Sequence, residues 1–180
     1  MSKSNLLLEL YSNIGTTGAL TFSSKSLVNK MLSYTDLSHA KVILELGGGD
    51  GSITQGIIDR MGPEAELLVF EINKSFCEAM KKQFPQDNVR IINDSAENID
   101  LYLHGREADY ILSSLPFSFI PKEATELILA KSKQGLTSKG KFIQICYSYL
   151  LKNLFKKYFD RVEAKFTLKN FPPAFVMICR

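Results

Sequence analysis

Short apolar runs alternate with amphipathic stretches along most of this chain. The runs, which have the length of buried strands, lie at residues 41–46, 67–71, 89–93, 109–113 and 141–146. The stretches with a helical pattern lie at about residues 51–61, 74–84, 97–103, 122–134 and 148–159. Alternation of this kind, with short connections, predicts an α/β protein with a parallel sheet and helices on both faces.

The C-terminal end breaks this alternation. Residues 162–169 and 174–179 have the pattern of two strands, and only Asn170-Phe171-Pro172-Pro173 separates them. A link this short cannot make a parallel crossover, so we expect an antiparallel hairpin.

The N-terminal end is expected to be helical. Residues 1–35 have the pattern of two amphipathic helices around a loop at 15–18, with Ser23 or Ser24 as a plausible N-cap of the second helix. We expect residues 1–35 to form a helical lid or substrate segment, and residues 36–180 to form the core of a single domain.

The most informative chemical signal begins at the end of the first strand. The stretch Glu45-Leu46-Gly47-Gly48-Gly49-Asp50-Gly51 is glycine-rich, and glycine lets the backbone turn tightly and approach a ligand. A carboxylate at Glu45 argues against a dinucleotide, because it would repel a pyrophosphate held at the next helix N-terminus. It suits a ligand with positive charge at that end, such as the amino group and sulfonium of S-adenosylmethionine (SAM). A generic strand-to-helix turn is the alternative.

This stretch resembles the E-x-G-x-G-x-G signature of the class I SAM-dependent methyltransferases, at Glu45, Gly47, Gly49 and Gly51. The resemblance covers essentially the whole chain, because βα units followed by a terminal hairpin are the layout of that family. It implies a Rossmann-like, seven-stranded, mostly parallel sheet, with SAM as the cofactor.

Two further acids follow the next two strands. A carboxylate at Glu71 can accept hydrogen bonds from both ribose hydroxyls, because adjacent strand tips line one crevice. An exposed strand-end glutamate is the alternative. Asp94-Ser95-Ala96 resembles the acid-then-small turn of the family, which implies that Asp94 binds the adenine amino group and that Ser95 or Ala96 donates a backbone N–H to the ring. Asp94 could instead cap the next helix.

A proline-containing turn follows the fourth strand. It resembles the Asn/Asp/Ser-Pro-Pro-Tyr/Phe pattern of amino-methyltransferases and the Asn-Leu-Pro-Tyr of rRNA adenine dimethylases, which implies catalytic roles for Ser114, Leu115, Pro116 and Phe117. Methyl transfer needs an aligned nucleophile and a site without water. Carbonyls of the turn can accept from an amine, and the Phe117 ring can lie beside a cation. In the alternative, Phe117 and Phe119 belong to the core.

Within the family, the nearest resemblance is to small bacterial phospholipid N-methyltransferases. It is carried by residues 18–25, 114–117 and 170–176. It implies an amine acceptor, the ethanolamine headgroup of a phospholipid first. The chain departs from that family at Thr21, where proline is usual, and in an N-terminal helix whose only base is Lys3.

An rRNA adenine N6-dimethyltransferase is the main alternative. Those enzymes usually carry a helical domain after the core, whereas this sequence reaches Arg180 directly after the last strand. Their Gly-Gln-Asn-Phe-type motif is also missing at Gly18-Ala19-Leu20. Both observations favour a lipid or small amine over nucleic acid. A small-molecule N-methyltransferase and a SAM-binding regulator without catalysis also fit the motifs.

Composition changes this picture little. The 180 residues are 45% hydrophobic and 23% charged, and a net charge of +3 does not by itself indicate nucleic acid. The cysteines are expected to be reduced core thiols, and no spacing of histidine or cysteine predicts a metal site. Without a recognisable signal peptide or membrane span, we expect a cytoplasmic protein. The apolar excess at 6–11 predicts peripheral contact with the inner membrane face, whereas the basic helix at 148–159 is expected to pack on the sheet.

Overall fold

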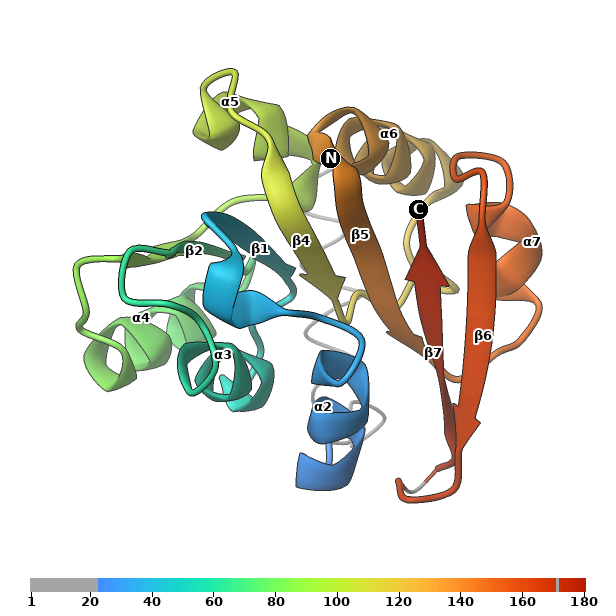
Figure 1. Ribbon diagram of the computed structural model, residues 1–180, viewed down its shortest axis with the longest axis horizontal. Helices are drawn as coiled ribbons and strands as arrows, with labels where there is room; N and C mark the ends of the chain where they lie inside the picture. Colours follow the sequence, from blue (N-terminus) through green and yellow to red (C-terminus); the bar gives the residue numbers. More distant parts are fainter. Residues whose placement is uncertain (1–22, 171) are drawn as a thin grey trace.

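The computed structural model describes residues 23–170 and 172–180, and its centre is a seven-stranded sheet (Figure 1). The strand order is β3-β2-β1-β4-β5-β7-β6. The parallel strands are β1 (Val42–Leu46), β2 (Glu66–Phe70), β3 (Val89–Ile92), β4 (Ala108–Ser113) and β5 (Leu136–Cys146). β7 (Ala174–Cys179) pairs antiparallel with both β5 and β6 (Val162–Thr167). The predicted fold is confirmed, including the terminal hairpin.

Helices cover both faces of this sheet. On one face lie α2 (Lys25–Leu32), α3 (Ser52–Ile58) and α4 (Lys74–Gln83). On the other lie η2 (Ala96–Asn98), α5 (Ile99–Leu103), α6 (Lys122–Gln134) and α7 (Leu151–Phe155). A further 3-10 turn, η1 (Leu37–His39), precedes β1. The interior strand β1 is buried on both faces, which explains the apolar run from Val42 to Leu44.

Two elements differ from the sequence-based expectation. β5 begins at Leu136 rather than 141, because its first residues continue the pairing with β4 past an irregularity between Ala108 and Tyr110. α7 is shorter than predicted, and hydrogen-bonded turns carry the chain on from it to Phe159. Phe155 and Phe159 are both buried on the sheet, so the packing predicted for this segment is confirmed.

The segment before β1 divides into two parts. The helix expected in the first 22 residues lies outside the described residues. The second helix, α2, is capped by Ser24, whose hydroxyl accepts from the Leu27 N–H at 3.2 Å. Its residues Leu27, Val28, Met31 and Leu32 are buried in the same core as β1 and α3. α2 is therefore an integral part of the sheet's packing.

All three thiols of the chain are free and buried, as the sequence predicts. Cys77 donates to the Glu71 carbonyl at 3.1 Å, and Cys146 and Cys179 lie on β5 and β7. Burial raises the pKa of Cys77 to about 11 and that of Cys146 to about 12. Among the helices of the described residues, none has the length and apolar character that a membrane span requires.

Candidate active site

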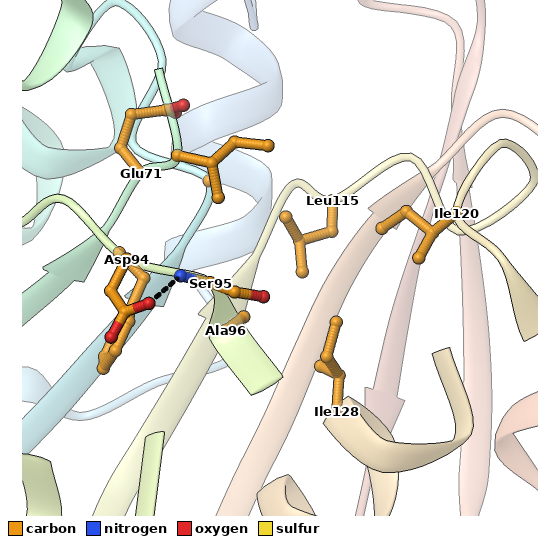
Figure 2. Close-up of a pocket in the computed structure, with 10 residues that line it drawn as sticks. Glu71, Asp94, Ser95, Ala96, Leu115, Ile120 and Ile128 are labelled. Atoms are coloured by element: carbon orange, nitrogen blue, oxygen red, sulfur yellow. Dashed lines mark hydrogen bonds between the residues drawn. The ribbon is translucent and has the colours of Figure 1, made fainter. Parts of the chain in front are cut away.

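The carboxyl ends of the parallel strands meet at one edge, and a pocket opens there (Figure 2). Figure 2 shows Glu71, Asp94 and Ser95 on one side, and Leu115, Ile120 and Ile128 on the other. The lining residues are Gly47, Phe70, Glu71, Ile72, Asp94, Ser95, Ala96, Leu115, Ile120 and Ile128. The pocket thus joins a polar wall from β2 and β3 to an apolar wall from α6 and the turn after β4.

The glycine loop and Glu71 form one hydrogen-bonded unit. The N–H of Gly49 donates to Glu71 Oε2 at 2.9 Å, and the N–H of Asn73 donates to Oε1 at 2.8 Å. Gly49 has φ of +53°, and a Cβ built on it would meet no heavy atom within 4 Å. Glu71 is 3% exposed, and burial raises its pKa despite the two N–H donors. Each carboxylate oxygen keeps a lone pair for a further donor.

Glu45 lies next to this unit in the sequence but does not line the pocket. Thr54 on α3 donates its hydroxyl to Glu45 Oε2 at 2.7 Å. The other oxygen, Oε1, is buried without a donor among the described residues. Burial is the main cause that raises the pKa of Glu45 to about 8, and the charges of Glu71 and Asp50 add to it. A buried carboxyl with one unsatisfied oxygen is a position where a cationic donor would be stabilised.

Asp94 both lines the pocket and organises the turn after β3. Its Oδ1 accepts from the Ser95 N–H at 2.7 Å and from Asn98, and its Oδ2 accepts from the Tyr102 hydroxyl at 2.9 Å. Ser95 caps η2 by accepting from the Glu97 N–H at 3.2 Å. The backbone N–H of Ser95 is therefore already bonded to Asp94, and an adenine ring would have to compete for it.

The turn after β4 contacts the glycine loop directly. The Ser114 hydroxyl donates to the Gly47 carbonyl at 2.8 Å, and the Ser114 N–H donates to the Leu46 carbonyl at 3.0 Å. The Leu115 side chain lines the pocket. The segments predicted to hold the cofactor and the acceptor are thus joined by two hydrogen bonds.

The rest of this turn faces the interior. Phe117 is 4% exposed and packs edge-on against Phe155, with ring centroids 5.8 Å apart. The Leu115 carbonyl accepts from the Phe117 N–H at 2.9 Å and from the Gln144 side-chain amide at 2.9 Å. Both lone pairs of that carbonyl are therefore occupied. The Pro116 carbonyl accepts from the Phe119 N–H at 2.8 Å.

The pocket brings some of the predicted residues together and leaves others outside it. Glu71, Asp94, Ser95, Gly47 and Leu115 line it, whereas Glu45 is buried in β1 and Gly49, Ser114 and Pro116 lie in the surrounding loops. Gly51 is the N-cap of α3 at φ of +79°, where a Cβ would meet the Phe84 ring at 2.7 Å. Its role in the structure is to let α3 begin against that ring.

Sequence reasoning missed the apolar wall and two buried polar residues. Ile72, Ile120 and Ile128 complete the pocket. Thr54 and Gln144 are fully buried, and Gln144 is the single polar residue in the apolar run from Phe142 to Cys146. A lone amide within a buried strand is a sequence signal, because such a group needs partners. Its Oε1 has none among the described residues.

Comparison with known proteins gives the class. A family described as "Methyltransferase domain" matches residues 43–140, from β1 into β5. Ornithine lipid N-methyltransferase of Singulisphaera acidiphila is 31% identical over 147 residues, covering 79% of this chain and 77% of that protein. Ribosomal RNA small subunit methyltransferase A of Mycoplasma capricolum is 30% identical over 123 residues, covering 67% of this chain. The alignment spans only 45% of that rRNA enzyme.

Solved structures agree on the fold. The 1,6-didemethyltoxoflavin-N1-methyltransferase of Burkholderia thailandensis superposes with a TM-score of 0.75 at 14% identity, covering 98% of this chain and 87% of that one. N-methyltransferase NodS of Bradyrhizobium japonicum gives 0.71 at 9% identity, covering 87% and 93%. A Rossmann-like sheet with carboxylates at successive strand tips defines the class as SAM-dependent methyltransferases. With the family match across the sheet, the chain belongs to the methyltransferase domain family and uses SAM as methyl donor.

The residues present fit SAM. The buried carboxyl of Glu45 lies directly before the glycine loop with one oxygen unsatisfied among the described residues, and the open space beside Gly49 leaves the backbone accessible. Glu71 offers lone pairs on two oxygens that backbone donors already hold in place. The isoleucine wall opposite Asp94 offers apolar surface for a flat ring.

Proposed function

We propose that this enzyme methylates an amine nitrogen in the headgroup of a membrane lipid. The observation that carries the proposal is the 31% identity to an ornithine lipid N-methyltransferase over 79% of this chain and 77% of the relative. The motif resemblance to phospholipid N-methyltransferases points to the same class of acceptor. Phosphatidylethanolamine and an ornithine lipid both present an amine, so they are the two acceptors to test.

The glycine loop and the ends of β1, β2 and β3 form the cofactor half of the site, which would bind and orient SAM. SAM supplies an activated methyl group on a sulfonium. Glu71 would accept from the ribose hydroxyls, and Asp94 would accept from the adenine amino group by exchanging its bond to Asn98 or Tyr102. Glu45 Oε1 would accept from the cationic amino-acid end. The N–H groups of Gly49 and Ser95 hold Glu71 and Asp94 in place, and Gly47 and Gly51 shape the loop at positive φ.

The turn after β4 would orient the acceptor. The Leu115 carbonyl is already saturated, whereas the Ser114 hydroxyl keeps its lone pairs and the Pro116 carbonyl keeps a second lone pair for an amine. An amine N–H bonded to Ser114 would lie beside Gly47, next to the cofactor loop. Phe117 would contribute through the packing of the turn, because its ring is buried against Phe155.

Transfer itself needs little from the protein beyond alignment. The turn after β4 would hold the lipid amine once its ammonium has lost a proton to water, so that the neutral nitrogen faces the cofactor. SAM would supply the methyl group and leave as the neutral thioether, which keeps the electron pair of the broken bond. The apolar wall of Leu115, Ile120 and Ile128 would exclude water from the reacting atoms.

A label-transfer experiment tests the acceptor. The protein is incubated with methyl-labelled SAM and, separately, mixed micelles of phosphatidylethanolamine, ornithine lipid or phosphatidylglycerol. We expect label in one or both of the amine lipids and none in phosphatidylglycerol, which has no amine. Wild-type protein that binds SAM but labels neither amine lipid would contradict the proposal.

Adenine methylation in rRNA is the second candidate. It is favoured by the 30% identity to ribosomal RNA small subunit methyltransferase A. A parallel incubation with unmodified 16S rRNA distinguishes it. Label in RNA and not in lipid would replace the lipid proposal by this one.

A further inference from the structure

An apolar patch lies at the tip of the β6–β7 hairpin and the loop after β5. The Phe175 ring lies 5.5 Å from that of Tyr149 and 5.0 Å from that of Phe166. Leu150 follows Tyr149 in the sequence and is 76% exposed. Leu168 comes two residues after Phe166 and is 73% exposed. We call Tyr149, Leu150, Phe166, Leu168 and Phe175 the hairpin-tip patch. Exposed apolar groups that gather in this way mark an interaction site.

The patch lies on the same edge of the sheet as the turn after β4, residues 114–117, which we call the acceptor turn. Cys146 at the end of β5 pairs with Phe175 at the start of β7, so the hairpin tip extends from the carboxyl end of β5. Gln144, two residues earlier on β5, donates to the Leu115 carbonyl in the acceptor turn. Figure 1 places the hairpin tip at the opposite end of the sheet from α5. A surface that contacts the patch would therefore be close to the reacting amine.

Positive charge borders the patch. Between residues 150 and 169 the sequence holds six basic and two acidic residues. Both acids are paired, Asp160 with Lys133 and Glu163 with Arg161 and Lys165. Lys152 lies over the Tyr149 ring, with its Nζ 5.4 Å from the centroid. Lys152 beside Tyr149 and Lys169 beside Leu168 form no ion pair among the described residues, so their charge is free to complement an anionic surface.

We propose that the hairpin-tip patch docks on the surface of an anionic lipid bilayer, with its apolar side chains in the interface and the lysines around it on the phosphates. This rests on the proposed lipid acceptor and specifies how the enzyme reaches it. Exposed leucines gain by leaving water for the acyl boundary, whereas they gain nothing from the charged backbone of RNA. The combination of leucine, aromatic and lysine side chains therefore favours a bilayer over RNA as the partner.

Vesicle co-sedimentation of the full-length protein tests this. Vesicles of phosphatidylcholine with phosphatidylglycerol carry negative charge and no primary amine, so binding is measured apart from catalysis. Wild-type protein should sediment with them and lose binding as salt is raised. Leu150→Asp and Leu168→Asp should each weaken binding by about tenfold or more, because each buries a charge in the interface. Leu101→Asp is the matched control, since Leu101 is 61% exposed and belongs to α5, at the opposite end of the sheet from the hairpin tip.

Three outcomes would overturn the docking proposal. They are a wild-type protein that does not bind these vesicles, patch variants that bind as well as Leu101→Asp, and a patch already covered in the free protein. If a second copy of the chain covers the patch, ultracentrifugation should show a dimer, and Leu150→Asp should dissociate that dimer. If the chain's own N-terminal segment covers the patch, both patch variants should have a Tm well below that of Leu101→Asp. Failure of the lipid-acceptor proposal is a separate result, because it is seen as an absence of label in the amine lipids of the micelle assay, whereas these three outcomes are measured without catalysis.

Discussion

The two halves of the strand edge are built differently. On the β1–β3 side, carboxylates are held by backbone N–H donors or a hydroxyl and keep acceptor capacity for a ligand, as Glu71 and Glu45 do. On the β4–β7 side, the acceptor turn is largely satisfied internally, with the Leu115 carbonyl saturated and the Phe117 ring in the core. The β1–β3 side, which is the cofactor half of the proposed site, therefore keeps side-chain acceptors open. The β4–β7 side, which is the acceptor half, has a well-packed turn and an exposed apolar patch but few free polar groups.

The largest effect should come from the aromatic core under the acceptor turn. We expect Phe117→Ala to lower the free energy of unfolding by about 3 to 5 kcal/mol, because it removes a buried ring in contact with Phe155. Denaturant unfolding measures this. Phe119→Ala, at a side chain that is 60% exposed, is the control. If Phe117→Ala left stability unchanged but reduced turnover, the ring would act on the reacting atoms and not through the core. The contrast between the two halves would then be wrong.

The pH dependence of stability tests the buried carboxyl of the cofactor half. The unfolded chain releases the Glu45 proton near pH 4.5, whereas the folded protein holds it up to about pH 8. Stability should therefore fall as pH rises through this window, by an amount on the order of 3 kcal/mol between about pH 5 and about pH 8. Glu45→Gln should remove this part of the slope, and Glu64→Gln, at an exposed position, should retain it. Parallel slopes in wild type and Glu45→Gln would show that Glu45 is ionised in the free protein.

Removal of the Glu71 carboxylate should weaken SAM binding. We expect Glu71→Ala to reduce the affinity by about 1 to 3 kcal/mol, since ribose hydroxyls and the Gly49 N–H both lose their acceptor. Titration calorimetry at fixed pH measures the change, with Glu64→Ala as the control. SAM affinity that is unchanged in both Glu71→Ala and Asp94→Ala would refute the site.

The smallest change in free energy should come from the hydrogen bond that links the two halves, between Ser114 and Gly47. Ser114→Ala removes the hydrogen bond to the Gly47 carbonyl and an open acceptor for the amine. We expect turnover to fall by about tenfold while SAM affinity changes by less than about 1 kcal/mol. Ser113→Ala on the neighbouring strand is a poor control because Ser113 is buried, so Ser118→Ala, in the exposed part of the turn, serves instead. A loss confined to SAM affinity would assign Ser114 to the cofactor half.

The sequence predicted the positions of the carboxylates in the fold better than the packing of the turn after β4, for a physical reason. Glu45, Glu71 and Asp94 are placed by the period of the strands, and parallel strands bring their ends to one edge whatever packs around them. The direction of the Phe117 ring depends on whether Phe155 fills the space beneath it, and no local pattern specifies that contact. The Gln144 amide reaches Leu115 across 29 residues, which only the folded chain reveals. Thr54 was likewise missed because its partner, Glu45, lies on another element.

The burial of every thiol has a practical consequence. With pKa values of about 11 and about 12, the Cys77 and Cys146 thiols are almost wholly protonated at neutral pH, and burial raises the pKa of Cys179 further still. Each is also shielded from bulky reagents. Alkylating dyes should therefore leave the native chain unlabelled while it stays folded. A single Leu150→Cys or Leu168→Cys change would then supply the one reactive thiol, and a fluorophore attached there would report the polarity of whatever surface the protein meets.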